Sequence, residues 1–297
     1  MITLDQVIRG ILTPAIVAAL LAWLGRWLRW RWVMPLGAGV AFILGYGLLG
    51  ATSAEKIAFW QLPGRLVQFP GLPPQDGPDW LFWMAIPATL LAVMDAVFQP
   101  KLGWILGAAA GAMAWVIVRP VVPGGVSLGA LCVCAIAVGL AGAGLCYIAR
   151  AVEPRIGAWA VAGGWCIAVG GAAVVVLACD SASIGVRGLA AAAALASVAA
   201  FSRRDAATGR SIAILAVAVL AGILAGGRFY AGVSWAQFAV LMASPALLAA
   251  AWIIPARRRR WATVIALLAV MALVFAVVAP AALAAKNASE SNSADPY

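Results

Sequence analysis

Few side chains in this chain could do chemistry, and one aspartate stands out among them. Histidine is absent from the 297 residues, which removes the commonest general base and metal ligand. Asp95 is the one acidic residue firmly inside a long apolar segment, where an ionised group is costly and needs a reason. Arg187 and Asp180 lie seven residues apart at the start of a later segment. These three residues are the candidate intramembrane polar sites.

Asp95 allows two interpretations. In a structural one it pairs with Lys101 or hydrogen-bonds a neighbouring helix. In a functional one it faces a water-reachable cavity and carries or coordinates a cation. We favour the structural interpretation, because no second ionisable group is expected at a comparable depth to complete a relay. Arg187 is expected to pair with Asp180. A direct pair between Asp95 and Arg187 is not expected, since they are placed at opposite sides of the membrane.

No catalytic, cofactor-binding or metal site is predicted, and the chain is not expected to be an enzyme. Paired aspartates of the aspartyl-protease kind, a phosphate loop and a dinucleotide fingerprint are all missing from the sequence. The cysteines sit in or beside apolar segments without metal-ligand spacing, which is typical of apolar packing. These cysteines are Cys132, Cys134, Cys146, Cys166 and Cys179.

Composition decides the fold class. Apolar residues make up 65% of the chain and charged residues 10%, whereas soluble domains carry about 25% charged residues. Apolar runs of about 18–25 residues are long enough to cross a bilayer as helices. The sequence therefore predicts an all-α polytopic membrane protein with about ten transmembrane helices. The predicted spans are 7–24, 33–51, 80–98, 102–118, 126–149, 157–179, 184–201, 212–227, 235–254 and 261–285.

These spans form one transmembrane domain over residues 1–285, followed by a disordered polar tail at 286–297. The long connection 52–79, between the second and third spans, is predicted to lie outside the cytoplasm. It is rich in proline and glycine, which is typical of an extended surface loop. Its first part, after Thr52, could instead form a short helix lying on the membrane surface.

Three glycines in the fourth span predict close helix packing. Gly103, Gly107 and Gly111 are four residues apart, so they share one face of a helix. Without Cβ atoms, that face lets a neighbouring backbone approach closely.

Tryptophan and arginine indicate the orientation. The stretch 23–35 places four tryptophans and three arginines between the first two spans, as expected of a hairpin at the inner surface of a membrane. Interface anchors are predicted at Trp27, Trp30, Trp32 and Trp261. Thirteen of the 20 basic residues fall in alternate connections. They are Arg26, Arg29, Arg31, Lys101, Arg150, Arg155, Arg203, Arg204, Arg210, Arg257, Arg258, Arg259 and Arg260.

The positive-inside rule then places both termini outside the cytoplasm, in a bacterial inner membrane. The net charge of +10 would favour nucleic acid in a soluble protein. Here the arginines border apolar spans, so the expected partners are the bilayer and its anionic headgroups at the cytoplasmic arginine clusters. Other membrane proteins are possible partners, and nucleic acid is not expected.

The stretches 73–83 and 179–183, the latter followed by an alanine-rich helix, resemble uncharacterised multi-pass membrane proteins of planctomycete-type bacteria. This resemblance implies no activity. The number of helices and the chain length also match those of drug/metabolite-type permeases. Those permeases, however, are expected to have cytoplasmic termini and short loops.

Two functions remain open. A small-solute transporter would explain the helix count, the prolines in the third and ninth spans, and Asp95. A non-catalytic membrane subunit or scaffold would explain the scarcity of polar residues within the spans. We favour the subunit or scaffold, because transporters normally line their path with polar groups at mid-membrane depth. A membrane-embedded enzyme is the least favoured alternative.

Overall fold

A computed structural model describes residues 7–50, 70, 77–98, 103–118, 128–179, 181–202 and 208–294. Over these ranges the chain forms helices and no strand. The α-helices are α2 (Thr13–Leu28), α3 (Val33–Gly50), α4 (Gly77–Phe98), α5 (Gly103–Val118), α6 (Leu128–Ile156), α7 (Ala158–Ala178), α8 (Ala182–Phe201), α9 (Thr208–Tyr230), α10 (Trp235–Ala243) and α11 (Arg259–Ala294). A π-helical turn, η1 (Ile8–Leu12), precedes α2, and the 3₁₀ helices η5 (Ser244–Trp252) and η6 (Ala256–Arg258) lie between α10 and α11.

The chain is a multi-pass α-helical membrane protein by the length and composition of these helices. Eight helical stretches are long and apolar enough to cross a membrane, and two shorter apolar helices span Val33–Leu49 and Gly103–Val116. Each of these stretches overlaps one of the apolar segments predicted from the sequence.

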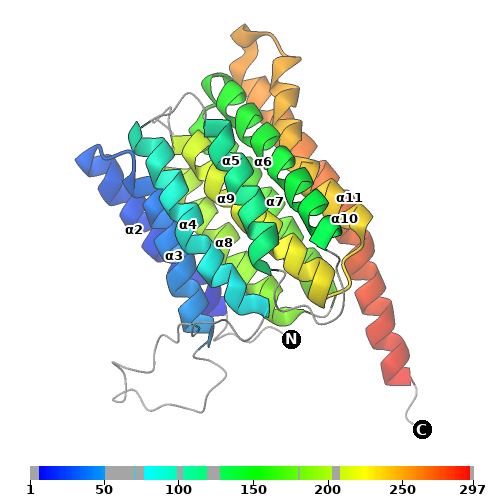
Figure 1. Ribbon diagram of the computed structural model, residues 1–297. Helices are drawn as coiled ribbons and strands as arrows, with labels where there is room; N and C mark the ends of the chain where they lie inside the picture. The colour runs from blue at the N-terminus through cyan, green and yellow to red at the C-terminus, as the bar shows by residue number, and fades with distance from the viewer. Residues whose placement is uncertain are drawn as a thin grey trace.

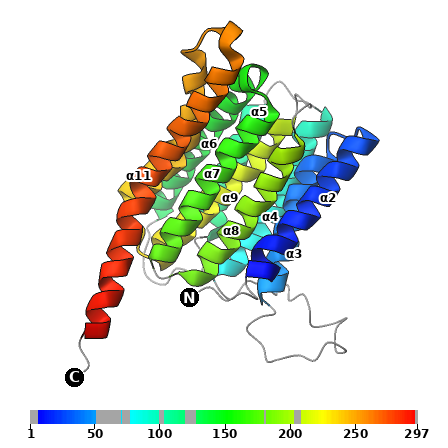
Figure 2. The same cartoon turned by 180° about the vertical axis from the view of Figure 1, so that it is seen from behind.

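Helix α9 forms the centre of the bundle and is the most deeply buried of the long helices. It contacts α4, α5, α6 and α7 along much of its length. Helices α2, α3 and α8 lie together at one edge, and α11 packs on α7 and η5 at the opposite edge, as two opposite views show (Figures 1 and 2).

The predicted hairpin between the first two spans is present. Helix α2 ends where Arg29 adopts a left-handed conformation with φ of 59°. The N–H of Trp30 then donates to the carbonyl oxygen of Gly25 at 2.9 Å, which closes the end of the helix. The chain reverses there and enters α3 at Val33.

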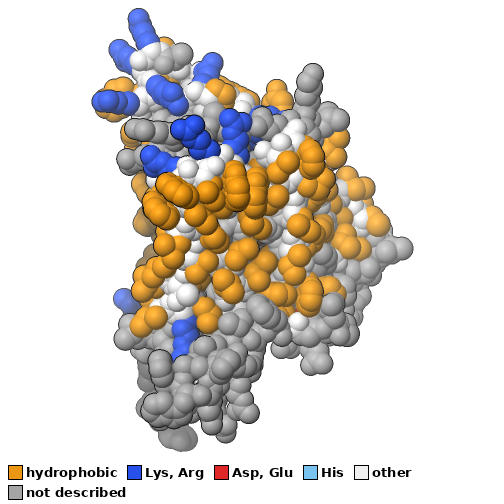
Figure 3. All heavy atoms as spheres, turned by 90° about the vertical axis from the view of Figure 1, so that its left-hand side faces the viewer, with side chains coloured by type: hydrophobic (Ala, Val, Ile, Leu, Met, Phe, Trp, Pro, Cys, Tyr) orange, Lys and Arg blue, Asp and Glu red, His pale blue; other side chains and the backbone are white. Residues whose placement is uncertain are grey.

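The basic residues gather at one end of the bundle. The turn from α2 to α3, the end of α6, the start of α9 and the start of α11 all lie at the upper end in Figure 1. On the face shown in Figure 3, lysine and arginine side chains concentrate at that end, above a broad band of hydrophobic side chains. We call it the basic end. Helix α3 ends, and α11 finishes, at the other end (Figures 1 and 2).

Helices α6 and α11 extend furthest beyond their predicted ends. Helix α6 continues past Ala149 to Ile156, so Arg150 and Arg155, which were predicted to lie in a connection, are helical. Helix α11 continues to Ala294 through residues that we predicted to be disordered. Residues 281–294 contain no glycine or proline, and their alanines favour helix continuation once the membrane segment has nucleated it.

The ninth predicted span is helical but not uniformly α-helical. Helix α10 ends at Ala243, and the nine-residue 3₁₀ helix η5 follows with Pro245 in its first turn. Proline cannot donate the backbone hydrogen bond that would continue α10. Most of the predicted loop 52–79 lies outside the described residues, and α4 begins at Gly77 rather than at Trp80.

Candidate functional site

Asp95, in the last turn of α4, is the centre of a buried polar cluster at the basic end. Its side chain is 1% exposed. Arg150 Nη2 of α6 donates to Oδ1 at 2.9 Å, and Ser211 Oγ of α9 donates to Oδ2 at 2.8 Å. Arg210 Nε, also on α9, lies 3.6 Å from Oδ2. One carboxylate therefore connects three helices.

Glu153 extends the cluster one turn along α6. This buried carboxylate accepts a hydrogen bond from the backbone N–H of Gly209 at 2.8 Å. Gly209 is in the first turn of α9, where backbone N–H groups have no partner within the helix. A Cβ atom at Gly209 would lie only 2.8 Å from Glu153 Oε1, so the missing side chain allows this contact. The carboxylate also lies near the positive end of the α9 dipole.

We call Asp95, Arg150, Glu153, Arg210 and Ser211 the Asp95 cluster. It contains two carboxylates and two guanidinium groups, so its formal charges balance. Arg150 and Arg210 keep 26% and 19% of their side-chain exposure, respectively. The Nε and Nη2 atoms of Arg210 are buried and make no hydrogen bond, although Nε has its ion pair with Asp95. Both guanidinium groups thus have the Asp95 carboxylate as a counter-charge.

The glycine ridge of α5 leads from this cluster along α6. A Cβ atom at Gly103 would lie 2.6 Å from both Arg150 Nη2 and Asp95 Oδ1. At Gly107 it would lie 2.9 Å from the carbonyl oxygen of Gly142, and at Gly111 it would lie 2.8 Å from that of Val138. The three glycines thus face the backbone of α6 and the Asp95 cluster.

Asp95 was predicted from the sequence, but its partners were not. The expectation that no second ionisable group lies at comparable depth is wrong, because Arg150 and Arg210 lie within ion-pair distance of Asp95. The expected partner Lys101 lies outside the described residues. One local signal was available: Cys146, Arg150 and Glu153 are spaced by four and three residues, which continues one face of a helix.

Arg187 belongs to a separate contact. Its guanidinium carbon lies 4.1 Å from the ring centroid of the buried Tyr46, within the range of a cation–π interaction. The Tyr46 hydroxyl donates to Asp79 Oδ1 at 2.8 Å. Arg187 is in the second turn of α8, which starts at the end opposite the basic end (Figure 1). Its expected partner Asp180 lies outside the described residues.

The predicted tryptophan anchors all lie beside basic residues at the basic end. Trp27, Trp30 and Trp261 are exposed and Trp32 is half-buried. The rings of Trp30 and Trp32 are stacked with centroids 5.5 Å apart. Exposed indole rings beside arginines suit the headgroup level of a bilayer.

Among the described residues, no group of three or more histidine, cysteine, aspartate or glutamate side chains is placed to hold a metal ion. The five cysteines are free thiols. Cys146 is buried against Gly107, which is a packing contact.

Comparisons of the chain with protein-family models, with curated proteins and with solved structures gave no match. What the protein does must therefore be inferred from its own geometry.

Proposed function

We propose that this protein is a non-catalytic membrane subunit or scaffold of a bacterial inner membrane. The observation that carries the proposal is the closed, apolar centre of the bundle. From Thr208 to Gly227 every residue of α9 is buried except Arg210, which is half-buried. Between Ser211 and Arg228 the helix contains only alanine, valine, leucine, isoleucine and glycine. A transport path normally has polar groups at this depth.

The state of the Asp95 cluster supports the same conclusion. A transporter carboxylate that binds a cation or a proton must reach water during its cycle. Asp95 is instead 1% exposed and is held by Arg150 and Ser211. Its neighbours balance its charge, so the cluster acts as a polar tie between α4, α6 and α9.

A groove on the lipid-facing side is the surface that best fits a partner helix. It lies between α6 and the α10–η5 segment, has a volume of about 410 Å³, and is lined by Ala141, Gly144, Phe238 and Met242 among other apolar residues. A Cβ atom at Gly144 would meet nothing within 4 Å. Small residues facing lipid allow another helix to approach closely.

The proposed topology has ten crossings, with the basic end in the cytoplasm and both termini outside. The common location of the turn from α2 to α3, the end of α6 and the start of α11 supports it (Figure 1). That end carries most of the arginines, as the positive-inside rule requires of a cytoplasmic surface.

A small-solute transporter is the second candidate, and the break between α10 and η5 favours it. Many transporters bind their substrate where a membrane helix is interrupted. Here the nine residues Ser244–Trp252 form a 3₁₀ helix, which is unusually long for that geometry.

Cysteine accessibility along α9 separates the two functions. In a variant without the natural cysteines, single cysteines would replace Ala216, Ala218 or Ala221, all buried. A small polar maleimide would then be applied to intact membranes from either side. A scaffold should leave all three positions unlabelled, whereas a cysteine at the exposed Ser234 should react as the positive control. Labelling of consecutive turns on one face of α9 would indicate a water path and a transporter.

A second experiment tests whether a partner helix binds in the groove, using the protein extracted with its native partners. Wild-type protein extracted in a mild detergent should run as a larger assembly than the isolated chain. Gly144→Leu should reduce that size without changing the stability of the chain, because the added side chain would occupy the groove. An assembly that is unchanged by Gly144→Leu would contradict the groove as the docking surface.

A further inference from the structure

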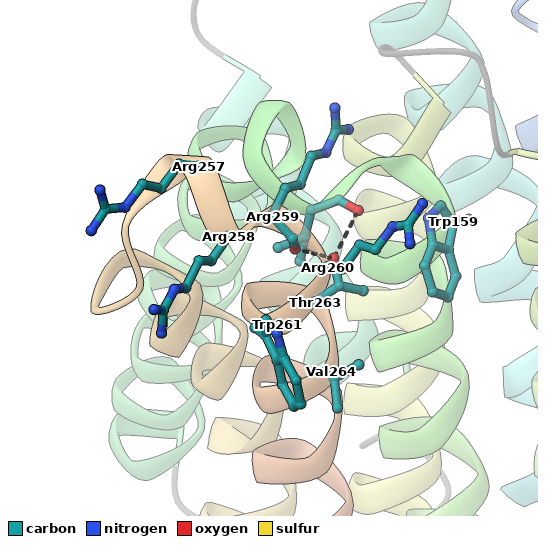
Figure 4. A pocket seen from close by; sticks show the side chains of 9 residues that line it. Trp159, Arg257, Arg258, Arg259, Arg260, Trp261, Thr263 and Val264 are labelled. Atoms are coloured by element: carbon teal, nitrogen blue, oxygen red, sulfur yellow. Dashed lines mark hydrogen bonds between the residues drawn. The ribbon is translucent and has the colours of Figure 1, made fainter.

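Four consecutive arginines form a basic site that, unlike the Asp95 cluster, contains no acidic residue. The short helix η6 and the first turn of α11 carry Arg257, Arg258, Arg259 and Arg260, all exposed. Together with Trp159 of α7 and Trp261, they line a hollow of about 960 Å³ (Figure 4). We call this hollow the arginine pocket.

The backbone around the arginine pocket is held in place by specific contacts. The Thr263 hydroxyl of α11 lies 3.4 Å from the carbonyl oxygen of Ile156, at the end of α6, and 3.1 Å from that of Arg259. Gly157 then turns the chain into α7 with a φ of 90°, a conformation that glycine adopts without strain. A Cβ atom at Gly157 would lie within 3.4 Å of both Trp159 and Arg259. The pocket is therefore built on three helix ends.

Electrostatics indicates what the pocket accepts. No carboxylate occurs among the lining residues of the pocket, and its four arginine side chains point in different directions (Figure 4), so the guanidinium groups have no counter-charge within the pocket. An anion bound there would supply that counter-charge. Guanidinium groups bind phosphate through paired hydrogen bonds, and the nearby N-terminus of α11 adds its positive dipole.

The position of the pocket indicates the source of that phosphate. Figure 4 shows Arg259 and Arg260 on the side of the α6–α7 turn, with Arg260 pointing toward Trp159 and with Trp261 below them on α11. Tryptophan favours the headgroup level of a bilayer. Further along α11, Val264, Ile265 and Leu268 are exposed apolar residues that acyl chains can cover. The cationic groups thus lie directly above a lipid-facing surface.

We propose that the arginine pocket binds the phosphate of an anionic phospholipid, whose acyl chains lie along the apolar face of α11. This inference requires only that the basic end lies at a bilayer surface. It does not depend on the scaffold role, which the cysteine-accessibility experiment tests separately.

The turn between α2 and α3 offers a matched control. It carries exposed arginines and tryptophans of the same kind, at the opposite edge of the basic end (Figures 1 and 2). Arg26→Gln/Arg31→Gln removes the same charge as Arg258→Gln/Arg260→Gln. Arg29 is left in place, because it has the left-handed backbone conformation that ends α2.

The experiment measures binding of phosphatidylglycerol to the purified full-length protein in neutral detergent, by native mass spectrometry and by thermal stabilisation. Wild type should bind phosphatidylglycerol in preference to phosphatidylcholine. Arg258→Gln/Arg260→Gln should bind it about 30-fold more weakly, since each basic residue at a membrane surface contributes about fivefold. Arg26→Gln/Arg31→Gln should stay near the wild-type affinity, because salt screens charges beyond about 8 Å.

Three outcomes would overturn the proposal. Equal losses in both double variants would indicate diffuse attraction to the whole basic end. Equal binding of phosphatidylcholine would remove the need for an anion. If soluble glycerol phosphate stabilised the protein against heat as fully as phosphatidylglycerol does, the pocket would be a site for a free phosphate ester rather than for a lipid. If Arg258→Gln/Arg260→Gln does not fold, the single variant Arg258→Gln should still weaken binding about fivefold.

Discussion

Replacing Asp95 by asparagine should destabilise the bundle at its basic end. The change keeps the size of the side chain but removes the negative charge that faces Arg150 and Arg210, at 2.9 and 3.6 Å. The cluster then has two guanidinium groups and only the carboxylate of Glu153. Leaving one partner of a buried ion pair uncompensated costs about 3–5 kcal/mol. The two arginines keep 26% and 19% exposure, so water offsets part of this loss, and we expect about 2–3 kcal/mol.

The assay is reversible unfolding of the purified protein in mixed micelles, followed by circular dichroism. Asp79→Asn is the matched control. That residue accepts a hydrogen bond from Tyr46 at the other end of α4, which an asparagine oxygen can still accept. Its loss of stability should therefore stay below about 1 kcal/mol. Combining Asp95→Asn with Arg150→Gln should cost less than the sum of the single changes, by about 1–3 kcal/mol, because the two residues are in direct contact.

If Asp95 instead serves transport, Asp95→Asn should affect uptake rather than stability. If Asp95→Asn left the unfolding free energy unchanged but abolished proton- or sodium-coupled uptake into vesicles, the carboxylate would have to work in a water-connected cavity. That result would refute the structural role of the Asp95 cluster and would favour the transporter.

Two further predictions concern packing and topology. Gly107→Leu should lower the unfolding free energy by about 1–3 kcal/mol, because even a Cβ atom would meet Cys146 and the backbone of Gly142. The control Gly144→Leu adds the same group where nothing lies within 4 Å and should leave the unfolding free energy unchanged. Equal effects of the two changes would contradict the close contact of α5 with α6. Reporter fusions after Arg204 and after Lys286 should report the cytoplasm and the outside, respectively, and a cytoplasmic signal after Lys286 would contradict the ten-crossing topology.

The sequence alone determined that this is a helical membrane protein and where its helices lie. Hydrophobic run length is a local property, so segments such as 157–179 and 184–201 closely match the observed α7 and α8. The positions at which helices end were harder to predict from the sequence. The end of α6 lies seven residues beyond Ala149, because Arg150 and Glu153 there bind groups of α4 and α9.

Tertiary structure alone decided which helix is central and what surrounds Asp95. The apolar segments have similar compositions, and the burial of α9 arises from the helices that pack around it. Arg150 and Ser211 lie 55 and 116 residues from Asp95 in the chain, so no spacing in the sequence indicates their contact. An ionised group within a membrane signals that a partner must exist, but the partner is selected by how the helices pack.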